Sequence, residues 1–287
     1  TDTKEKTTTA AGGLVGACDY SSVSISGINA VDLTVTGTYL RDVGGLIAGG
    51  RNGNGKSVTV TDCRISNITV MNNQSNTNER CTGGIIGYHN TKLTISDVKL
   101  DKKSTISGRQ YTGGFVGYSG GHVEIEACQI DETDIYSSSN NWVGGLIGCF
   151  FAKDTAVIKN CQEKDVNILG RYVGGLTGSN KGNIQASNME FIGIRVVTRY
   201  DNAYSAGLLT GYTEKKNNVV VSGYNILASS CKVGYVKVSN VESLTPTVKF
   251  ELKPKTGLWV GDNQETNKIT LVAVSTDGDI FPQKDIG

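Results

Sequence analysis

Short runs of alternating apolar and polar residues recur along most of the chain, separated by Gly, Asn, Ser and Asp. Such runs occupy residues 23–25, 58–60, 93–95, 123–125 and 219–221, and a further set includes residues 33–35, 68–70 and 166–168. Alternation with a period of two between turn-forming residues is typical of β-strands. No window carries a convincing amphipathic-helix pattern, so we expect almost no helix.

A block of the form x-Gly-Gly-(Leu/Ile/Phe)-(Ile/Val/Thr)-Gly occurs seven times and divides the chain into repeats. The blocks begin 30 to 39 residues apart, and the longest interval contains a polar insert at residues 71–78. The leading positions are Gly12, Gly44, Gly83, Gly113, Gly144, Gly174 and, in the seventh copy, Ala206. We expect the glycines to mark either a tight bend or a place that must leave room for packing.

Three short strands and three turns in each repeat predict an all-β fold, a right-handed parallel β-helix of about seven coils. A propeller blade would need four strands in about 40 residues or more, and a sandwich would not explain identical residues at identical phases. We expect residues 1–11 to form a tail, 12–235 the β-helix, and 236–287 a β-rich cap or a junction to a further module. Within that cap, residues 269–274 predict a strong strand.

Two apolar columns should stack inside the coils. The first follows the glycine pair and consists of Leu14, Leu46, Ile85, Phe115, Leu146, Leu176 and Leu208. The second lies three residues beyond each alternating run and consists of Ile28, Cys63, Val98, Cys128, Cys161, Met189 and Tyr224.

Three of the seven cysteines fall in the second column, where a free thiol behaves as a small apolar residue. We therefore expect mainly reduced, structural cysteines. Cys128 and Cys161 lie on adjacent coils, where a disulfide is an alternative that the sequence does not require.

The composition narrows the range of partners. The chain has 28 Lys and Arg against 27 Asp and Glu, a formal charge of +1, so it exerts no general attraction on nucleic acid or anionic lipid. No apolar run approaches the roughly 20 residues of a membrane-spanning helix. We expect no nucleic-acid partner and no membrane insertion by this chain.

The blocks at residues 43–47, 143–148 and 172–178, each followed by a strand such as Ile158-Lys-Asn-Cys161, resemble GLUG-motif repeats. The resemblance covers roughly residues 12–212. It implies an extracellular binding or spacer region of a large bacterial surface or secreted protein, such as an adhesin. The departures from the motif are Ala206 and an apparent extra residue in the second and seventh blocks.

Two motif matches have structural explanations. Residues 50–57 match the phosphate-loop pattern with Lys56 in the lysine position, but the next residues form an alternating strand instead of a helix. Residues 117–121 match the nucleophile elbow around Ser119, again with no helix after it. We interpret both as ordinary turns of the repeat.

The remaining chemistry-bearing residues predict neither catalysis nor a cofactor. The two histidines, His89 and His122, are expected in exposed turns, and two ligands make a poor metal site. Asp277-Gly-Asp279 is interpreted as a turn, because it lacks the carboxylates of a calcium loop. The acids form no column across three coils, as a polysaccharide-degrading β-helix would require.

One column is a candidate binding site. Two places before the leading position stand Tyr111, Trp142, Tyr172 and Tyr204, with Arg41, Arg80, Arg109 and Arg171 nearby. Aromatic faces beside polar groups suit sugar rings. The competing interpretation is a buried structural ladder, which strict alternation favours because it places the column on the interior face.

We therefore expect a non-catalytic, monomeric, extracellular module that binds a glycan or a protein ligand. The alternatives are a spacer or stalk and, less favoured, a polysaccharide-degrading enzyme.

Overall fold

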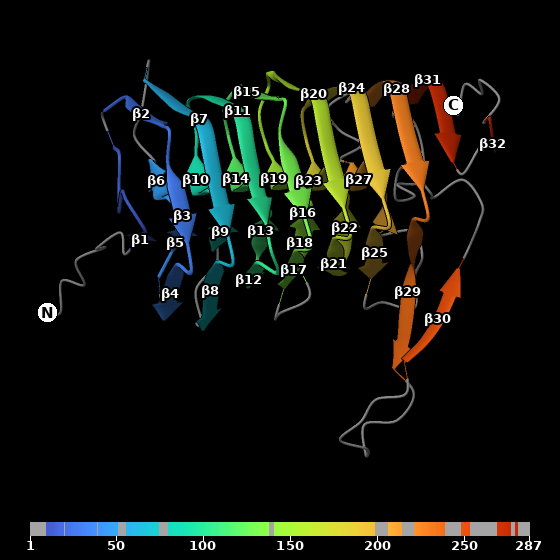
Figure 1. Ribbon diagram of the computed structural model, residues 1–287, viewed down its shortest axis with the longest axis horizontal. Coiled ribbons are helices and arrows are strands. Elements are labelled where there is room, and N and C mark those ends of the chain that lie inside the picture. Colours follow the sequence, from blue (N-terminus) through green and yellow to red (C-terminus); the bar gives the residue numbers. More distant parts are fainter. Residues whose placement is uncertain are drawn as a thin grey trace, which may run out of the picture.

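The computed structural model describes residues 10–19, 21–38, 40–50, 56–74, 80–137, 141–198, 206–213, 221–238, 248–252, 269–276 and 279–280. All of the regular structure in these residues is β-strand, and the strands stack along the long axis of the molecule (Figure 1). Strands of consecutive repeats pair in parallel, so the chain forms a β-solenoid. The predicted all-β parallel architecture is confirmed.

Each full coil contributes to four sheets, which we name A to D in the order in which the chain enters them after the start of a block. Sheet A consists of β1 (Ala10–Gly12), β5 (Asp42–Gly44), β9 (Cys81–Gly83), β13 (Tyr111–Gly113), β18 (Trp142–Gly144), β22 (Tyr172–Gly174) and β26 (Ala206–Gly207). Sheet B consists of β6 (Ile47–Gly50), β10 (Ile86–His89), β14 (Val116–Ser119), β19 (Ile147–Phe150), β23 (Thr177–Asn180) and β27 (Thr210–Thr213).

The other two sheets carry the rest of the coil and both ends of the solenoid. Sheet C consists of β2 (Val23–Ser26), β3 (Asn29–Val31), β7 (Ser57–Ser66), β11 (Lys92–Asp101), β15 (Val123–Glu126), β16 (Gln129–Asp131), β20 (Thr155–Lys164), β24 (Asn183–Ile192), β28 (Val221–Ser229), β31 (Ile269–Thr276) and β32 (Asp279–Ile280). Sheet D consists of β4 (Thr34–Thr38), β8 (Thr69–Gln74), β12 (Thr105–Gly108), β17 (Asp134–Ser137), β21 (Asn167–Gly170), β25 (Arg195–Thr198), β29 (Lys232–Val238) and β30 (Val248–Leu252).

The pairing changes direction at the C-terminal end. The strong strand expected at residues 269–274 is β31, which continues sheet C in parallel beside β28. Two pairs of described strands are antiparallel, namely β30 with β29 and β32 with β31. No helix in the described residues is long and apolar enough to cross a membrane.

The long strands of sheet C bend where a residue adopts a positive φ. One such corner holds Asp62, Asp97, Ala127, Asn160, Asn188 and Asn225 on successive coils. Asn and Asp are the non-glycine residues that best tolerate this conformation. The amides also link the coils, because Asn188 Nδ2 donates to Asn160 Oδ1 at 2.8 Å and Asn225 Nδ2 donates to Asn188 Oδ1 at 2.9 Å.

The block glycines allow sheets A and B to approach each other backbone to backbone. A Cβ atom on Gly144 would overlap the carbonyl oxygen of Ile147 and lie 2.8 Å from the nitrogen of Gly178. Positive φ values occur among the described glycines only at Gly27 and Gly193, which belong to no block. The structure therefore supports the second of the two expected roles, in which the block glycines leave room for packing.

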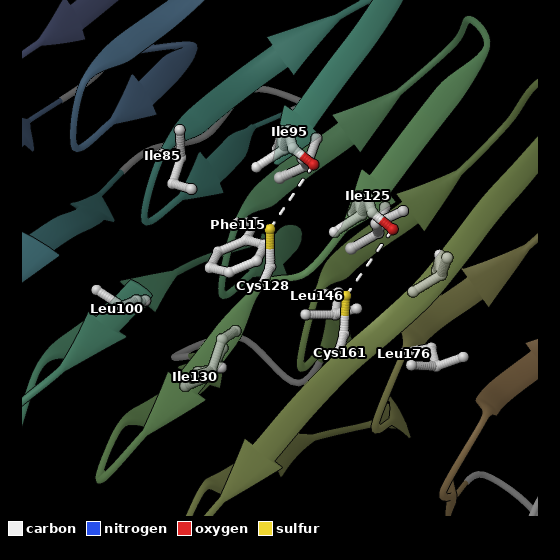
Figure 2. Packing of buried hydrophobic residues seen from close by; sticks show 14 of the residues in the cluster. Ile85, Ile95, Leu100, Phe115, Ile125, Cys128, Ile130, Leu146, Cys161 and Leu176 are labelled. Atoms are coloured by element: carbon white, nitrogen blue, oxygen red, sulfur yellow. Dashed lines mark hydrogen bonds between the residues drawn. The ribbon is translucent and has the colours of Figure 1, made fainter. Parts of the chain in front are cut away.

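The first apolar column forms the core between the sheets, and Figure 2 shows Ile85, Phe115, Leu146 and Leu176 within it. These side chains are fully buried. Leu14 is the exception at 54% exposure, so its expected burial is wrong. It lies in the first described coil, where the described residues cover it from one side only.

The expected register of the last coil was wrong by two residues. Val221 pairs with Ile184 and Ile226 pairs with Met189, so Ile226 continues the second column and Tyr224 does not belong to it. The other members from Cys63 to Met189 are buried, and Ile28 is half-buried.

The apparent extra residues in two blocks are explained by pairing. In the seventh block Ala206 pairs with Val173 and Gly207 pairs with Gly174, so Gly207 is the leading glycine. Leu208 therefore takes the place of the second glycine, and the expected place of Leu208 in the first apolar column is wrong, because Leu209 lies opposite Leu176. In the second block Ile47 pairs with Ile86 and Gly49 with Tyr88. Ala48 therefore occupies the place of a glycine, and nothing is inserted.

All seven cysteines are free thiols, so no disulfide joins Cys128 to Cys161. Each of these two thiols points at a backbone carbonyl of the preceding coil, with Sγ 3.7 Å from the oxygen of Ile95 and 3.8 Å from that of Ile125, respectively (Figure 2). The interaction with Cys128 and burial raise the pKa of Cys161. The expectation of buried structural thiols in this column is confirmed.

Candidate functional site

Three of the four candidate aromatic residues form one ladder along sheet A. Tyr111, Trp142 and Tyr172 pair in register, with ring centroids 5.2 Å apart for the first pair and 5.8 Å apart for the second. Their expected interior position is wrong, because they are only half-buried, whereas the next residues, such as Val143 and Val173, are fully buried. Tyr204 lies outside the described residues.

A second ladder runs along sheet B and the turn that follows it. Tyr88 and Tyr118 stack with centroids 5.0 Å apart and planes inclined by 2°, and Phe151 follows at 6.3 Å from Tyr118. The Nζ atom of Lys181 lies 4.6 Å from the centre of the Phe151 ring. Aromatic stacking thus ends in a cation–π contact on the next coil.

The two ladders lie beside each other. The ring of Tyr111 contacts that of Tyr118 at 5.2 Å, and the ring of Tyr172 contacts that of Tyr212 at 5.1 Å. The planes of both pairs are tilted by more than 50°. Seven aromatic side chains from the two sheets therefore form one continuous surface, which we call the aromatic groove: Tyr88, Tyr111, Tyr118, Trp142, Phe151, Tyr172 and Tyr212.

A cavity of about 270 Å³ opens within the aromatic groove. It exists because Cys149 and Ser179 occupy the sheet B position that Tyr88 and Tyr118 fill on the preceding coils. Two small side chains in succession leave the volume of two rings empty. The lining consists of Cys81, Tyr88, Tyr111, Tyr118, Trp142, Cys149, Phe151, Ser179 and Lys181.

Two polar atoms on the cavity wall have no hydrogen-bond partner among the described residues. They are the Ser179 Oγ and the Trp142 Nε1, both buried. Ser179 is only 1% exposed. A buried donor or acceptor without a partner costs about 1–3 kcal/mol, so each of these atoms would gain from a ligand that supplies the missing partner.

Aromatic stacking limits how a ligand meets the rings. Because Trp142 lies between Tyr111 and Tyr172 with planes inclined by 25° and 18°, its faces are covered by its neighbours. A sugar therefore cannot stack on all the ring faces of the sheet A ladder as a bare aromatic column would suggest. A ligand would instead contact the ring edges and the two small residues, Cys149 and Ser179. Burial raises the pKa of Tyr118, so its phenol stays neutral.

A second, larger cavity of about 590 Å³ adjoins the first. The two share Tyr88, Tyr118, Phe151 and Lys181. The larger one is completed by the turn residues Asn90, Gly120, Ala152, Lys153, Gly182 and Asn183. Together they form one recess with an aromatic part and a polar part.

The sequence carries a signal for the sheet B ladder at one position of the repeat. Tyr88, Tyr118, Cys149, Ser179 and Tyr212 each directly follow the last glycine of a block. Across the repeats, this position alone predicts the aromatic rings of the ladder and the two small residues that interrupt them.

Each motif match is followed by a strand and not by a helix, as expected. Residues 51–55 of the phosphate-loop match lie outside the described residues, and the strand β7 begins at Ser57 directly after Lys56. In the nucleophile-elbow match Ser119 is fully buried and its Oγ donates to the carbonyl oxygen of Gly121 at 3.1 Å. The strand β15 follows.

The expected exposure of the histidines is wrong for His89. It lies at the end of β10 and is only 1% exposed. Burial lowers its pKa to about 3, so the ring is neutral. His122 is half-exposed and lies 3.1 Å from Glu124. The described residues hold no group of three or more possible metal ligands.

The strand pattern does not predict one buried acid, Glu163. Glu163 is fully buried between Ile130 and Phe191, the residues that pair with it on the adjacent coils. Its side chain lies over Gly145, which has no Cβ to obstruct it. Neither carboxyl oxygen has a partner, and burial raises its pKa well above the ordinary value.

These features define the protein as a parallel β-solenoid repeat protein with an aromatic groove at the junction of two sheets. No protein-family model, curated protein or solved structure matches the chain.

Proposed function

We propose that this chain is a non-catalytic binding module of a larger bacterial surface or secreted protein, adhesin-like in character, and that it binds a sugar residue of a glycan in the aromatic groove. The module acts outside the cell and as a monomer. The resemblance of its blocks to GLUG-motif repeats supports the location and the adhesin-like role. The chemistry of the aromatic groove supports a sugar residue as the ligand.

The observation that carries the proposal is the pair of unpartnered polar atoms in an aromatic-lined cavity. Small-ligand sites are typically apolar and aromatic pockets with a few placed polar groups. The Trp142 N–H can only donate, whereas the Ser179 hydroxyl can donate and accept. A sugar ring offers hydroxyls that do both, together with apolar C–H groups that pack against ring edges. The cavity of about 270 Å³ is of a size for one sugar residue.

A glycan array tests this function, with wild type compared with Trp142→Phe. Phenylalanine keeps an aromatic ring in the ladder and removes only the indole N–H and part of the ring. We expect a defined set of glycans to bind the wild type, and the variant to bind them about tenfold more weakly, the value of one well-placed hydrogen bond. Equal binding by both proteins would contradict the assignment of the site.

A spacer function is the second candidate, because an unbroken stack of coils gives a stiff rod from β1 to β31. A spacer needs no ligand, so it predicts that no glycan on the array binds. The polysaccharide-degrading alternative requires two carboxylates about 5 to 10 Å apart beside the sugar. Among the described residues that line the two cavities there is no Asp or Glu, which weighs against it.

A further inference from the structure

The polar part of the recess is lined by two lysines. Lys181 lines both cavities, and Lys153 lines the larger one. Asp154 is next to Lys153 in the chain, but it is exposed and lines neither cavity. The described lining residues of the two cavities therefore include two lysines and no carboxylate.

Lys181 is held in a fixed place by its backbone and by the second ladder. Its amide nitrogen donates to the carbonyl oxygen of Phe150 at 2.8 Å, which continues the coil-to-coil pairing of sheet B into the turn. Its Nζ lies against the Phe151 ring, whose face stabilises the ammonium group. The ammonium group is thus positioned at the boundary between the aromatic cavity and the polar cavity.

The polar cavity has further donors for an oxyanion. Asn90 and Asn183 line it with side-chain amides, whereas the backbone amides of Gly120 and Gly182 already donate to the carbonyl oxygen of His89 and to Asn180 Oδ1. Ammonium and amide N–H groups are the donors that bind carboxylates and sulfates most strongly. A neutral sugar in the aromatic cavity would leave this half of the recess unused.

We infer that the glycan bound by this module is anionic: a sugar residue seated beside Trp142 and Ser179 carries, or adjoins, a carboxylate or sulfate group that Lys181 and Lys153 bind in the adjoining cavity. This inference rests on the proposed glycan-binding function and adds to it the chemical class of the ligand.

The test uses matched glycans that differ only in charge. The array carries each glucuronate-, galacturonate- or sialate-terminated glycan beside its methyl ester, and each sulfated glycan beside its unsulfated parent. The best-binding pair is then titrated by calorimetry into the wild type, Lys181→Met, Lys153→Met and the control Lys164→Met. Lys164 ends β20 on sheet C and lines neither cavity.

We expect the anionic member to bind the wild type about tenfold more tightly than its neutral partner, and added salt to reduce that preference. Lys181→Met should abolish the preference, Lys153→Met should reduce it, and Lys164→Met should leave it unchanged. Carboxylated and sulfated pairs report separately which anion is recognised. A far-UV circular dichroism spectrum confirms that each variant is folded.

Two results would overturn the inference in different ways. Neutral and anionic partners that bind equally, with no effect of Lys181→Met, would refute the anionic class while the glycan-binding function stands. No binding of any glycan would refute the proposed function itself.

Discussion

Replacing Glu163 with glutamine should change how the stability of the protein depends on pH. In the folded protein the carboxyl group is buried among apolar side chains and keeps its proton above its ordinary pKa. In the unfolded chain the same group ionises near its ordinary pKa. Above that pKa the unfolded state therefore binds fewer protons than the folded state, and the free energy of unfolding falls as the pH rises.

The size of this effect follows from proton linkage. Each pH unit above the ordinary pKa lowers the free energy of unfolding by about 1.4 kcal/mol, for as long as the folded protein keeps the proton. Glutamine has a similar shape and no proton to lose. The stability of Glu163→Gln relative to wild type should therefore increase by about 1.4 kcal/mol for each pH unit from about pH 5 upward.

Urea denaturation followed by far-UV circular dichroism at pH 5, 6 and 7 measures the difference. The matched control is Glu190→Gln, one coil further along, where Glu190 is half-exposed and accepts a hydrogen bond from Gln162. A stability difference between Glu163→Gln and wild type that stays constant from pH 5 to 7 would refute the reasoning, because it would show that the carboxyl group is not protonated in the folded state.

Three further predictions concern other parts of the molecule. The pKa of His89 is about 3 in the folded protein and higher in the unfolded chain, so the free energy of unfolding of the wild type should fall as the pH decreases from about 6.5 towards 3. His89→Leu should make this fall smaller. Urea denaturation that shows the same pH dependence for the variant and the wild type would contradict this. Cys63, Cys128 and Cys161 should resist alkylation in the native protein and react after denaturation, as mass spectrometry would show, whereas rapid native labelling of all three would mean that their column faces solvent. Lys56→Ala should change the free energy of unfolding by less than about 0.5 kcal/mol, as is usual at exposed positions, and saturable ATP binding that this variant loses would show that the turn is a phosphate loop after all.

The repeating part of the fold could be predicted because stacking requires the same kind of residue at the same position of every coil. The apolar residue after the glycine pair is buried from Leu46 to Leu176, as its period indicates. The prediction failed where that requirement changes. Leu14 has a described neighbour on one side only, and the spacing along the sequence changes before β26 and β28, so that counting from the previous coil misplaced Ala206 and Tyr224.

The candidate site was predictable only in part. Tyr111, Trp142 and Tyr172 were found from their period, but their orientation was not, because strict alternation does not continue through a bend built on two glycines. The cavity depends on which side chains are small, at Cys149 and Ser179, and on the contact between two sheets. The burial of His89 and Glu163 likewise depends on neighbours from other coils, which a single strand pattern does not contain.

The most direct test of glycan binding is a calorimetric titration of the best array ligand into the wild type and into Ser179→Ala. The Ser179 hydroxyl has no partner in the part of the chain that the structure describes, so its removal should leave the free energy of unfolding unchanged or slightly raised. If a sugar hydroxyl is its partner, Kd should nevertheless increase by about tenfold, while the control Ser187→Ala on sheet C binds as the wild type does. An unchanged Kd for Ser179→Ala, or the absence of any glycan that binds the wild type, would contradict the account.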